Sequence, residues 1–307
     1  MSHHIANRLL LVLPGYSQLR AARAMPFLCI MCCLLMAPAQ SAQQQGILYK
    51  FQKPGGETHY LFGTMHATDP RIINMLEHVA EPLAASQQLV MEMVPDVTAM
   101  ISSSAGMLLP AGQSLQQQLG DELYVKVLAA VADKGLTDPV LQRLKPWAVA
   151  ITIGLPELDG KFLDQRIYQL AVENGQQVYG LESAAEQTAV FDGLPLELQI
   201  RMLEDTLEQL SELPAMLEIM IKTYMARDLV KLQQLTLEYE LSSADRSLAD
   251  CFREELIVNR NIRMARRLAS LLENGSSFVA VGALHLVDDS GLILALKQAG
   301  YQVESIY

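Results

Sequence analysis

The chain has 307 residues, half of them hydrophobic, with a formal net charge of −11 at pH 7 and a pI near 5.0. This length and apolar content exclude a disordered chain and suffice for a substantial core. The acidic balance argues against a nucleic-acid partner, which would need clustered Lys and Arg, and no basic amphipathic segment for anionic lipid is present.

Residues 1–42 are predicted to be a secretory signal peptide. Arg20 and Arg23 precede an apolar core that starts at Pro26, and small residues suited to cleavage follow at Ala39 and Ala42. The core is shorter than the ~20 residues that a membrane-spanning helix needs, and no other transmembrane span is expected. We therefore expect an extracytoplasmic protein, periplasmic or secreted. The alternative is that an uncleaved signal anchors the chain to the membrane.

Strands and helices are predicted to alternate along residues 43–307. Two apolar segments, Ile47–Phe51 and His59–Phe62, flank a turn-rich interval and predict a β-hairpin. A helix is expected from Asp69-Pro70 through Leu83, because Asp favours a helix cap and Pro the first turn. Further strands are predicted at Gln88–Met93, Gln177–Glu182, Ser277–Val281 and Tyr301–Ile306.

Helical periodicity dominates residues 103–156 and 195–274. The second stretch is expected to be interrupted at Pro214. The helices predicted here and elsewhere are Ser114–Gln118, Asp121–Lys134, Asp138–Leu144, Lys161–Asn174, Ala244–Asn274 and Gly291–Ala299. Because no Ser/Gly linker divides the chain, we predict a single α/β domain over residues 43–307. Its central mixed sheet would be flanked by helices, with a large helical insertion between its two halves.

Two predicted strands end in the same motif, Gly-x-x-His. Tyr60–His66 contains Gly63, and Phe278–His285 contains Gly282. In α/β proteins, ligands bind outside the carboxyl ends of strands, where both histidines would lie. The alternative for each is a core histidine that is hydrogen-bonded to backbone.

Two further strand ends carry the acids Glu92 and Glu182. With His66 and His285 they form a mixed nitrogen and oxygen set, which suits zinc, manganese, iron or cobalt better than calcium or magnesium. Spacing alone does not show that the four converge. Glu92 lies in an apolar run and needs a partner, either in a site or in the core. The alternative for Glu182 is a cap for the helix that follows it.

Other catalytic signatures are absent from the sequence. It contains no His-Glu-x-x-His, no Gly-x-Ser-x-Gly, no phosphate-binding glycine loop and no dinucleotide fingerprint. The common metalloprotease, serine hydrolase and nucleotide-binding interpretations therefore lack support.

Taken together, the motifs resemble the TraB/GumN family, also called the YbaP/TraB type. This family is related to the animal Tiki proteases, within a superfamily of ChaN-like and erythromycin-esterase-like proteins. The resemblance spans roughly Gly46 to Tyr307. It rests on motifs in a fixed order: Leu61–His66, Glu92, Lys145-Pro-Trp147, Asp164, Gly180-Leu-Glu182 with Gln187, Asn259-Arg-Asn261, Met264-Ala265, Val281–His285 and Gly291-Leu292.

The resemblance implies a divalent-metal site, with manganese, cobalt or zinc as the candidates, and in the Tiki branch a metal-dependent protease. His66 and His285 are then the expected metal ligands. Glu92 and Glu182 are expected as a further ligand or as the general base that activates water.

Other matched residues are expected to assist. Arg260 and Asn261 would polarise a carbonyl or hold a carboxylate, although a basic residue near a helix end often serves only the helix dipole. Lys145 and Trp147 would shape or close the substrate pocket, to which Asp164 is also assigned. One departure from the family pattern lies in Leu286–Gly291, where two acids replace an expected glycine-containing turn and would alter metal preference or substrate charge.

The predicted function is an exported divalent-metal-dependent hydrolase, most simply a peptidase acting on a peptide or small-molecule substrate. Metal-bound water would attack, a glutamate would serve as general base, and the metal or Arg260 would stabilise the oxyanion. The alternative is a non-catalytic protein that sequesters a peptide or ligand in the same pocket. A purely structural envelope protein would not explain polar residues at four strand ends. The sequence indicates no oligomeric state.

Overall fold

A computed structural model of the chain describes residues 46–155, 160–242 and 253–307. The predicted signal peptide and the first part of the helix predicted over Ala244–Asn274 lie outside these ranges. Within them, no helix is both long and apolar enough to cross a membrane.

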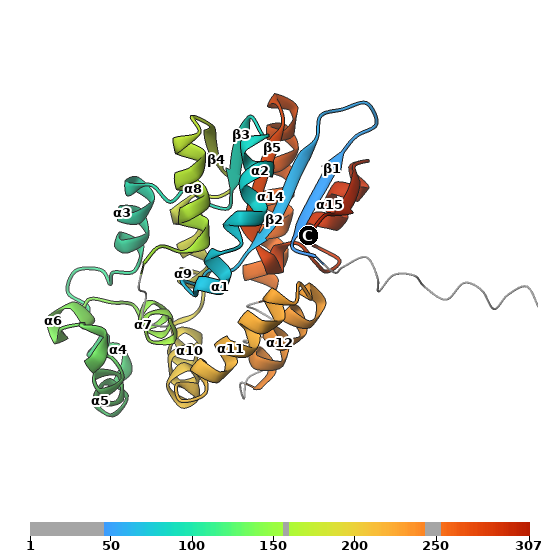
Figure 1. Cartoon of the computed structure of the whole chain (residues 1–307). Helices are drawn as coiled ribbons and strands as arrows, with labels where there is room; N and C mark the ends of the chain where they lie inside the picture. The colour runs from blue at the N-terminus through green and yellow to red at the C-terminus, as the bar shows by residue number, and fades with distance from the viewer. Residues whose placement is uncertain (1–45, 156–159, 243–252) are drawn as a thin grey trace, which may run out of the picture. The chain divides into compact units, whose positions relative to one another are not determined.

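A six-stranded mixed sheet lies at the centre of the fold (Figure 1). Its strand order is β4-β3-β5-β2-β1-β6, in which β2, β5, β3 and β4 run parallel and β1 is antiparallel to both of its neighbours. The strands are β1 Leu48–Gln52, β2 His59–Thr64, β3 Gln88–Met91, β4 Gln177–Gly180, β5 Ser277–Gly282 and β6 Gln302–Ser305. The predicted α/β fold, mixed sheet and β-hairpin are confirmed.

The register brings four strand ends to one edge of the sheet. Thr64 of β2 pairs with Gly282 of β5, and Met91 of β3 lies between Ala280 of β5 and Gly180 of β4. The central strands β3 and β5 are buried almost throughout, as expected for parallel strands covered on both faces. Every residue that directly follows these four strands therefore emerges at the same edge.

Helices cover both faces of the sheet. The helices α1 (Pro70–Ile73) and α2 (Leu76–Ala84) follow β2, and α2 packs against α8 (Leu163–Glu173) before β4. The chain then returns across the sheet from β4 to β5 through α14 (Asn259–Leu271), which contacts α15 (Leu292–Gln298). The helix α14 lies on the face of the sheet opposite α2 and α8 (Figure 1), as the general preference for right-handed crossovers predicts.

Two predicted boundaries are corrected and a third is confirmed. The helix expected from Asp69-Pro70 is broken near Asn74 into α1 and α2. The strands β3 and β4 end before Glu92 and Glu182, so both acids lie past the strands. The interruption expected near Pro214 is confirmed: α10 ends at Gln209, residues 210–212 form a turn, and Pro214 lies in the first turn of α11 (Leu213–Met225), where proline is tolerated.

The predicted helical stretch between β3 and β4 builds a second hydrophobic core. This core joins α7 (Pro146–Gly154) and α10 (Leu196–Gln209) through Val149, Ile153 and Leu203. The smaller helices around it are α4 Leu115–Leu119, α5 Asp121–Ala130 and α6 Asp138–Leu141. The helix α9 (Ala184–Asp192) precedes the second stretch, and α12 (Leu229–Ser242) lies within it.

One helix, α3 (Val97–Gly106), was not predicted. None of its residues is buried, so it carries no apolar stripe that faces a core. Its start is fixed by Asp96, whose side chain accepts a hydrogen bond from the Ala99 amide at 2.7 Å. Its last residue, Gly106, lies against Thr188 of α9, where an added Cβ would come within 3.0 Å of the threonine hydroxyl.

Candidate functional site

A chain of charged contacts links three of the four strand ends. The Arg260 guanidinium of α14 donates from Nε to Glu182 Oε2 at 2.8 Å and from Nη2 to Glu92 Oε2 at 2.7 Å. The other oxygen of Glu92 lies 3.5 Å from Nε2 of His285. The structure therefore brings Glu182, Arg260, Glu92 and His285 together, whereas His66 lies in a separate pair.

Glu92 is held at the end of β3 by both neighbouring elements. The backbone N–H of Gly282 donates to Oε1 at 2.5 Å, and the side-chain amide of Gln187 donates from Nε2 to Oε2 at 3.4 Å. Burial raises the pKa of the Glu92 carboxyl, but the neighbouring His285, the Arg260 charge and the Gly282 amide lower it by more, so the net shift is downward and the carboxylate is ionised at neutral pH. A Cβ on Gly282 would lie 3.0 Å from Oε1, so glycine is what allows this approach.

His285 is buried and neutral at pH 7. Burial lowers its pKa more than the nearby Glu92 carboxylate raises it. Its Nδ1 lies 2.7 Å from Oδ1 of Asn261, and because that oxygen only accepts, Nδ1 carries the proton. The lone pair of Nε2 then faces the carboxylate oxygen of Glu92. Two electron-rich atoms at this separation favour a cation or a shared proton between them.

The glycine of the first Gly-x-x-His motif makes room for the second motif. An added Cβ on Gly63 would lie 3.0 Å from the Ala283 Cα and 3.0 Å from a methyl group of Leu286. Ala283 begins the short 3₁₀ turn η5 (Ala283–His285), which carries His285. The Gly63 carbonyl accepts a hydrogen bond from the buried Tyr224 hydroxyl at 2.7 Å. The two glycines therefore serve close packing at the strand ends.

His66 forms a second imidazole–carboxylate pair. Its Nδ1 lies 3.5 Å from Asp164 Oδ2, and its ring stacks on Phe162 with centroids 3.6 Å apart. Asp164 Oδ1 accepts from the Thr64 hydroxyl at 2.6 Å, whereas Oδ2 is buried and has no hydrogen-bond partner. The His66 side chain is 62% exposed, so its remaining nitrogen is open to a ligand.

Both carboxylate oxygens of Glu182 accept hydrogen bonds from arginines. Its side chain is fully buried, and its oxygens accept from Arg260 and from Arg263 Nη2 at 3.0 Å. The alternative, that Glu182 caps the following helix, is excluded because Ser183 caps α9 in a reciprocal arrangement with Glu186. The two acids and two arginines sum to zero charge, which is how such a network is accommodated inside a protein.

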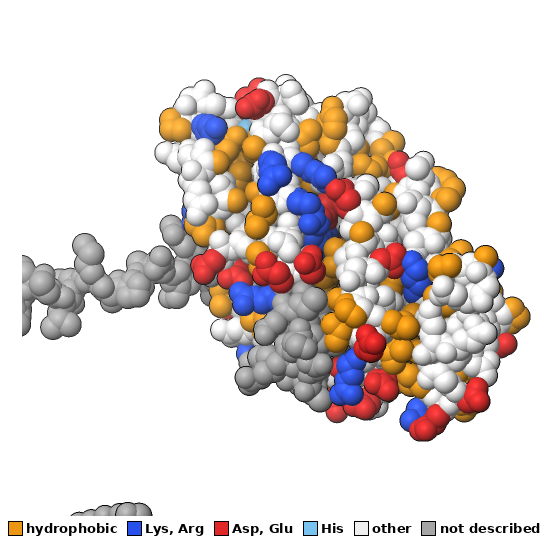
Figure 2. All heavy atoms as spheres, turned by 180° about the vertical axis from the view of Figure 1, so that it is seen from behind, with side chains coloured by type: hydrophobic (Ala, Val, Ile, Leu, Met, Phe, Trp, Pro, Cys, Tyr) orange, Lys and Arg blue, Asp and Glu red, His pale blue; other side chains and the backbone are white. Residues whose placement is uncertain are grey.

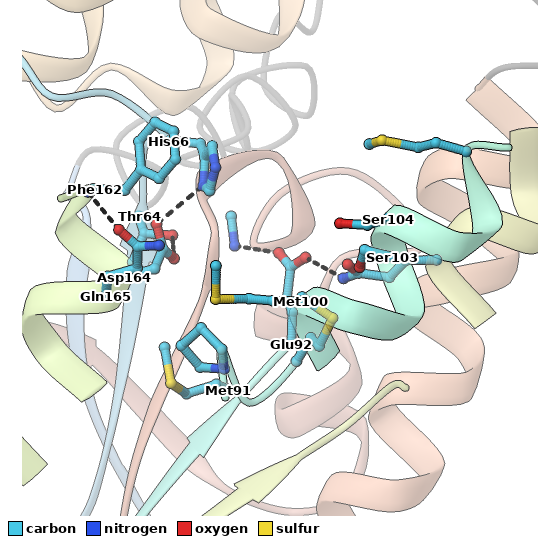
Figure 3. A pocket seen from close by; sticks show the side chains of 15 residues that line it. Thr64, His66, Met91, Glu92, Met100, Ser103, Ser104, Phe162, Asp164 and Gln165 are labelled. Carbon is cyan, nitrogen blue, oxygen red and sulfur yellow. Dashed lines mark hydrogen bonds and ion pairs between the residues drawn. The ribbon is translucent and has the colours of Figure 1, made fainter. Parts of the chain in front are cut away.

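A pocket of about 580 Å³ opens at these strand ends (Figure 3). Its polar lining includes two residues that the sequence did not single out, Thr64 and Gln165, although Thr64 lies within the first Gly-x-x-His motif. Gln187, noted only as part of a motif, also lines it. The other lining residues used below are His66, Glu92, Phe162, Asp164, Met91, Met93, Met100, Ser103, Ser104 and Met107.

Lys145 and Trp147, assigned to the substrate pocket, lie elsewhere. Neither lines this pocket. The Lys145 ammonium donates to Asp192 at 2.7 Å, and the buried Trp147 indole N–H donates to the same carboxylate at 2.8 Å while its ring stacks on Phe191. These contacts tie the start of α7 to the end of α9, which is a structural role.

The loop after His285 departs from the family pattern in sequence but keeps a backbone conformation typical of glycine. Asp288 has φ +79°, a left-handed conformation that favours glycine, so the acid stands at a position with a glycine geometry. Its carboxylate accepts from Arg253 at 2.8 Å. Viewed from behind, acidic and basic side chains lie intermingled on the surface (Figure 2), in keeping with pairs such as Arg253–Asp288 and Arg267–Glu186.

The predicted metal ligands do not form one set. Across the described ranges, no three His, Cys, Asp or Glu side chains are grouped so that they could hold a metal ion. Glu182 does not fit as a ligand, because arginines hold both of its oxygens. The pairs His66–Asp164 and His285–Glu92 do fit a cation in donor chemistry, since each joins an imidazole to a carboxylate. The unpartnered Oδ2 of Asp164 is the clearest such feature.

Comparison with known proteins gives one family. The TraB/PrgY/gumN family matches residues 47–305. Similar proteins include Metalloprotease TIKI1 of Danio rerio, which is 27% identical over 80% of this chain and 60% of its own length. Metalloprotease TIKI2 of Danio rerio is 26% identical over 87% of this chain and 62% of its own length. Metalloprotease TIKI1 of Homo sapiens is 26% identical over 80% of this chain and 59% of its own length.

The chain thus spans about 60% of the length of the curated relatives that it matches. No solved structure matches it.

Proposed function

The chain belongs to the TraB/PrgY/gumN family, and we propose that it is a divalent-metal-dependent hydrolase that cleaves peptide bonds. The observation that carries the proposal is the pairing of His66 with Asp164 and of His285 with Glu92 at the ends of adjacent parallel strands, beside a pocket. The relatives named metalloproteases support the same reaction class.

His66, Asp164 and His285 are the residues that would hold the ion, and their side chains would have to move closer together to do so, because no three such donors are grouped in the described residues. When bound, the ion would polarise the scissile carbonyl and the attacking water. Asn261 keeps the proton of His285 on Nδ1 and so leaves Nε2 free to act as a donor. The Phe162 ring, stacked on His66, limits the orientations of that imidazole.

Glu92 is the proposed general base. Its lowered pKa keeps it ionised at neutral pH, so its Oε1 is available to take a proton from water as the new C–O bond forms. The proton then passes to the leaving amine when the C–N bond breaks. Arg260 is assigned to positioning, because its Nε, Nη1 and Nη2 all have protein partners.

We further propose that the protein is exported, on the strength of the predicted signal peptide at residues 1–42. Fractionation of cells that express the full chain, together with N-terminal sequencing of the product, tests this. A product that begins near Gln43 outside the cytoplasm is expected. Recovery of an intact N-terminus in the cytoplasmic fraction would contradict it.

Metal titration tests the reaction class. The purified full chain is stripped with chelator, and Mn²⁺, Co²⁺ and Zn²⁺ are added while binding is followed by calorimetry and cleavage of a peptide library by mass spectrometry. We expect about one ion per chain and restored cleavage. His66→Ala and His285→Ala should each lower metal affinity at least tenfold, as expected for loss of a ligand. A folded wild-type chain that binds none of the three ions would rule out the metal-dependent reaction.

The same variants separate cleavage from capture. For a hydrolase, His66→Ala abolishes turnover while peptide binding persists. For the alternative, a protein that sequesters peptides without cleaving them, wild type would bind peptides and metal yet produce no fragments.

A further inference from the structure

We infer that one wall of the pocket is the subsite that receives an apolar side chain of the peptide substrate. Four residues form this methionine wall: Met91, Met93, Met100 and Met107. The inference rests on the proposed function and specifies its substrate class. The wall comes from two elements, the end of β3 and the helix α3, which faces the pocket from the side opposite Phe162 and Asp164 (Figure 3).

The wall begins beside the proposed base. Met91 and Met93 are the sequence neighbours of Glu92, and all three line the same pocket. An apolar side chain seated on these methionines would therefore have its backbone close to the Glu92 carboxylate. The subsite is consequently assigned to a residue adjacent to the scissile bond.

The α3 helix presents one of its faces to the pocket. Met100, Ser103 and Ser104 of α3, with Met107 directly after the helix, are spaced at i, i+3, i+4 and i+7, which places them on one side of the helical turns, and all four line the pocket. The Met100 side chain is nevertheless 60% exposed, and α3 buries none of its residues. Covering an exposed apolar side chain releases free energy, so a ligand that completes this wall is favoured.

The chemistry of the wall sets the preference. Methionine is unbranched and polarisable, so its side chain adapts to apolar partners of different shape. Leucine, methionine and phenylalanine should therefore be accepted with little discrimination. An aspartate or glutamate side chain would lose its hydration against thioethers, and it would also approach the carboxylates of Asp164 and Glu92, which line the same pocket.

Two labelled peptides of equal length, identical except for Leu or Glu at the central position, test the wall. Their affinities for the chelator-stripped full chain are measured by fluorescence anisotropy, and their cleavage by the metal-loaded chain is measured separately. We expect the Leu peptide to bind at least tenfold more tightly, the size of effect that an apolar pocket produces. Equal affinity for the two peptides, or no binding of either, would overturn the assignment.

A matched pair of variants separates the wall from general surface charge. Met100→Lys should reduce the Leu-over-Glu preference about tenfold, because it places a cation in the subsite. Ile101→Lys adds the same charge on the next residue of α3, which is 66% exposed and does not line the pocket, and should leave the preference within about twofold. Met100→Leu should preserve it. If Met100→Lys and Ile101→Lys behave alike, the wall is not the subsite.

The two readouts also distinguish this inference from the proposed function. A Leu preference in binding, without cleavage of any peptide, would keep the subsite and refute the hydrolase. Cleavage that ignores the central residue would keep the hydrolase and refute the subsite.

Discussion

Replacing Glu182 with Gln distinguishes a structural acid from a metal ligand. The carboxylate is fully buried and accepts one hydrogen bond from Arg260, whose own side chain is only 11% exposed, and one from Arg263. Removing one partner of a buried ion pair costs about 3–5 kcal/mol, and the lower end applies here because Arg260 keeps its contact with Glu92. The pairing with Arg263 adds little, because that arginine is about one-third exposed and solvent screens it.

We therefore expect Glu182→Gln to lower the free energy of unfolding by about 3 kcal/mol, since glutamine keeps one acceptor oxygen. Metal affinity of the folded variant should stay within about threefold of wild type, because Glu182 belongs to neither imidazole–carboxylate pair. Urea unfolding followed by circular dichroism gives the first quantity, and calorimetric titration with Zn²⁺ gives the second.

Glu186→Gln is the matched control for this experiment. Glu186 pairs with Arg267 at 2.6 Å, but the side chains are 35% and 42% exposed, so the substitution should cost less than about 1 kcal/mol. The reasoning is refuted if Glu182→Gln abolishes metal binding while its unfolding free energy stays at the wild-type value. That result would place Glu182 in the metal site.

Three further predictions follow from single contacts. Gly282→Ala should cost about 1–3 kcal/mol of stability and reduce peptide cleavage at least tenfold, because the new Cβ would lie 3.0 Å from Glu92 Oε1. Urea unfolding and a cleavage assay measure the two effects, and an unchanged unfolding free energy together with an unchanged cleavage rate would disprove the prediction. Asp192→Ala should cost about 1–3 kcal/mol, because the buried Trp147 N–H loses its acceptor, while the kcat of peptide cleavage remains at the wild-type level; a selective loss of kcat would restore a pocket role for Trp147. Burial lowers the pKa of His59 below 6.5, against the opposing effect of Glu57, so folding favours the neutral imidazole. Its contribution to stability is therefore present above pH 6.5 and is lost as the pH falls through the lower pKa of the folded state. The free energy of unfolding in urea should decrease with falling pH less steeply in His59→Gln than in wild type, and equal slopes would contradict this.

The strand ends could be predicted because their signal is local. Apolar runs closed by Gly-x-x-His or by an acid fix the strand type and its carboxyl end, and parallel neighbours in an α/β sheet bring such ends to one edge. The helix α3 gave no such signal, since a helix without a buried face has no apolar periodicity. The second hydrophobic core likewise depends on packing between segments distant in sequence, such as Val149 with Leu203.

The roles of the polar residues depended on partners that spacing does not reveal. Glu92 and Glu182 looked equivalent, each an acid at a strand end. The difference lies in α14, whose Arg260 and Arg263 donate to both oxygens of Glu182, whereas Glu92 keeps one oxygen toward His285 and the pocket. Arg260 lies 78 residues from Glu182 and 168 residues from Glu92, so their contacts depend on how a distant helix packs against the strand ends.

The two Gly-x-x-His motifs can also be understood as one packing device. Gly63 lets the turn that carries His285 approach β2, and Gly282 lets Glu92 approach β5, so each glycine positions a group that belongs to another strand. A side chain at either position would separate adjacent strand ends by the few tenths of an ångström that hydrogen bonds and metal ligands do not tolerate. The motif therefore requires glycine for the geometry of its neighbour, and this explains why both copies end parallel strands that pair directly with each other.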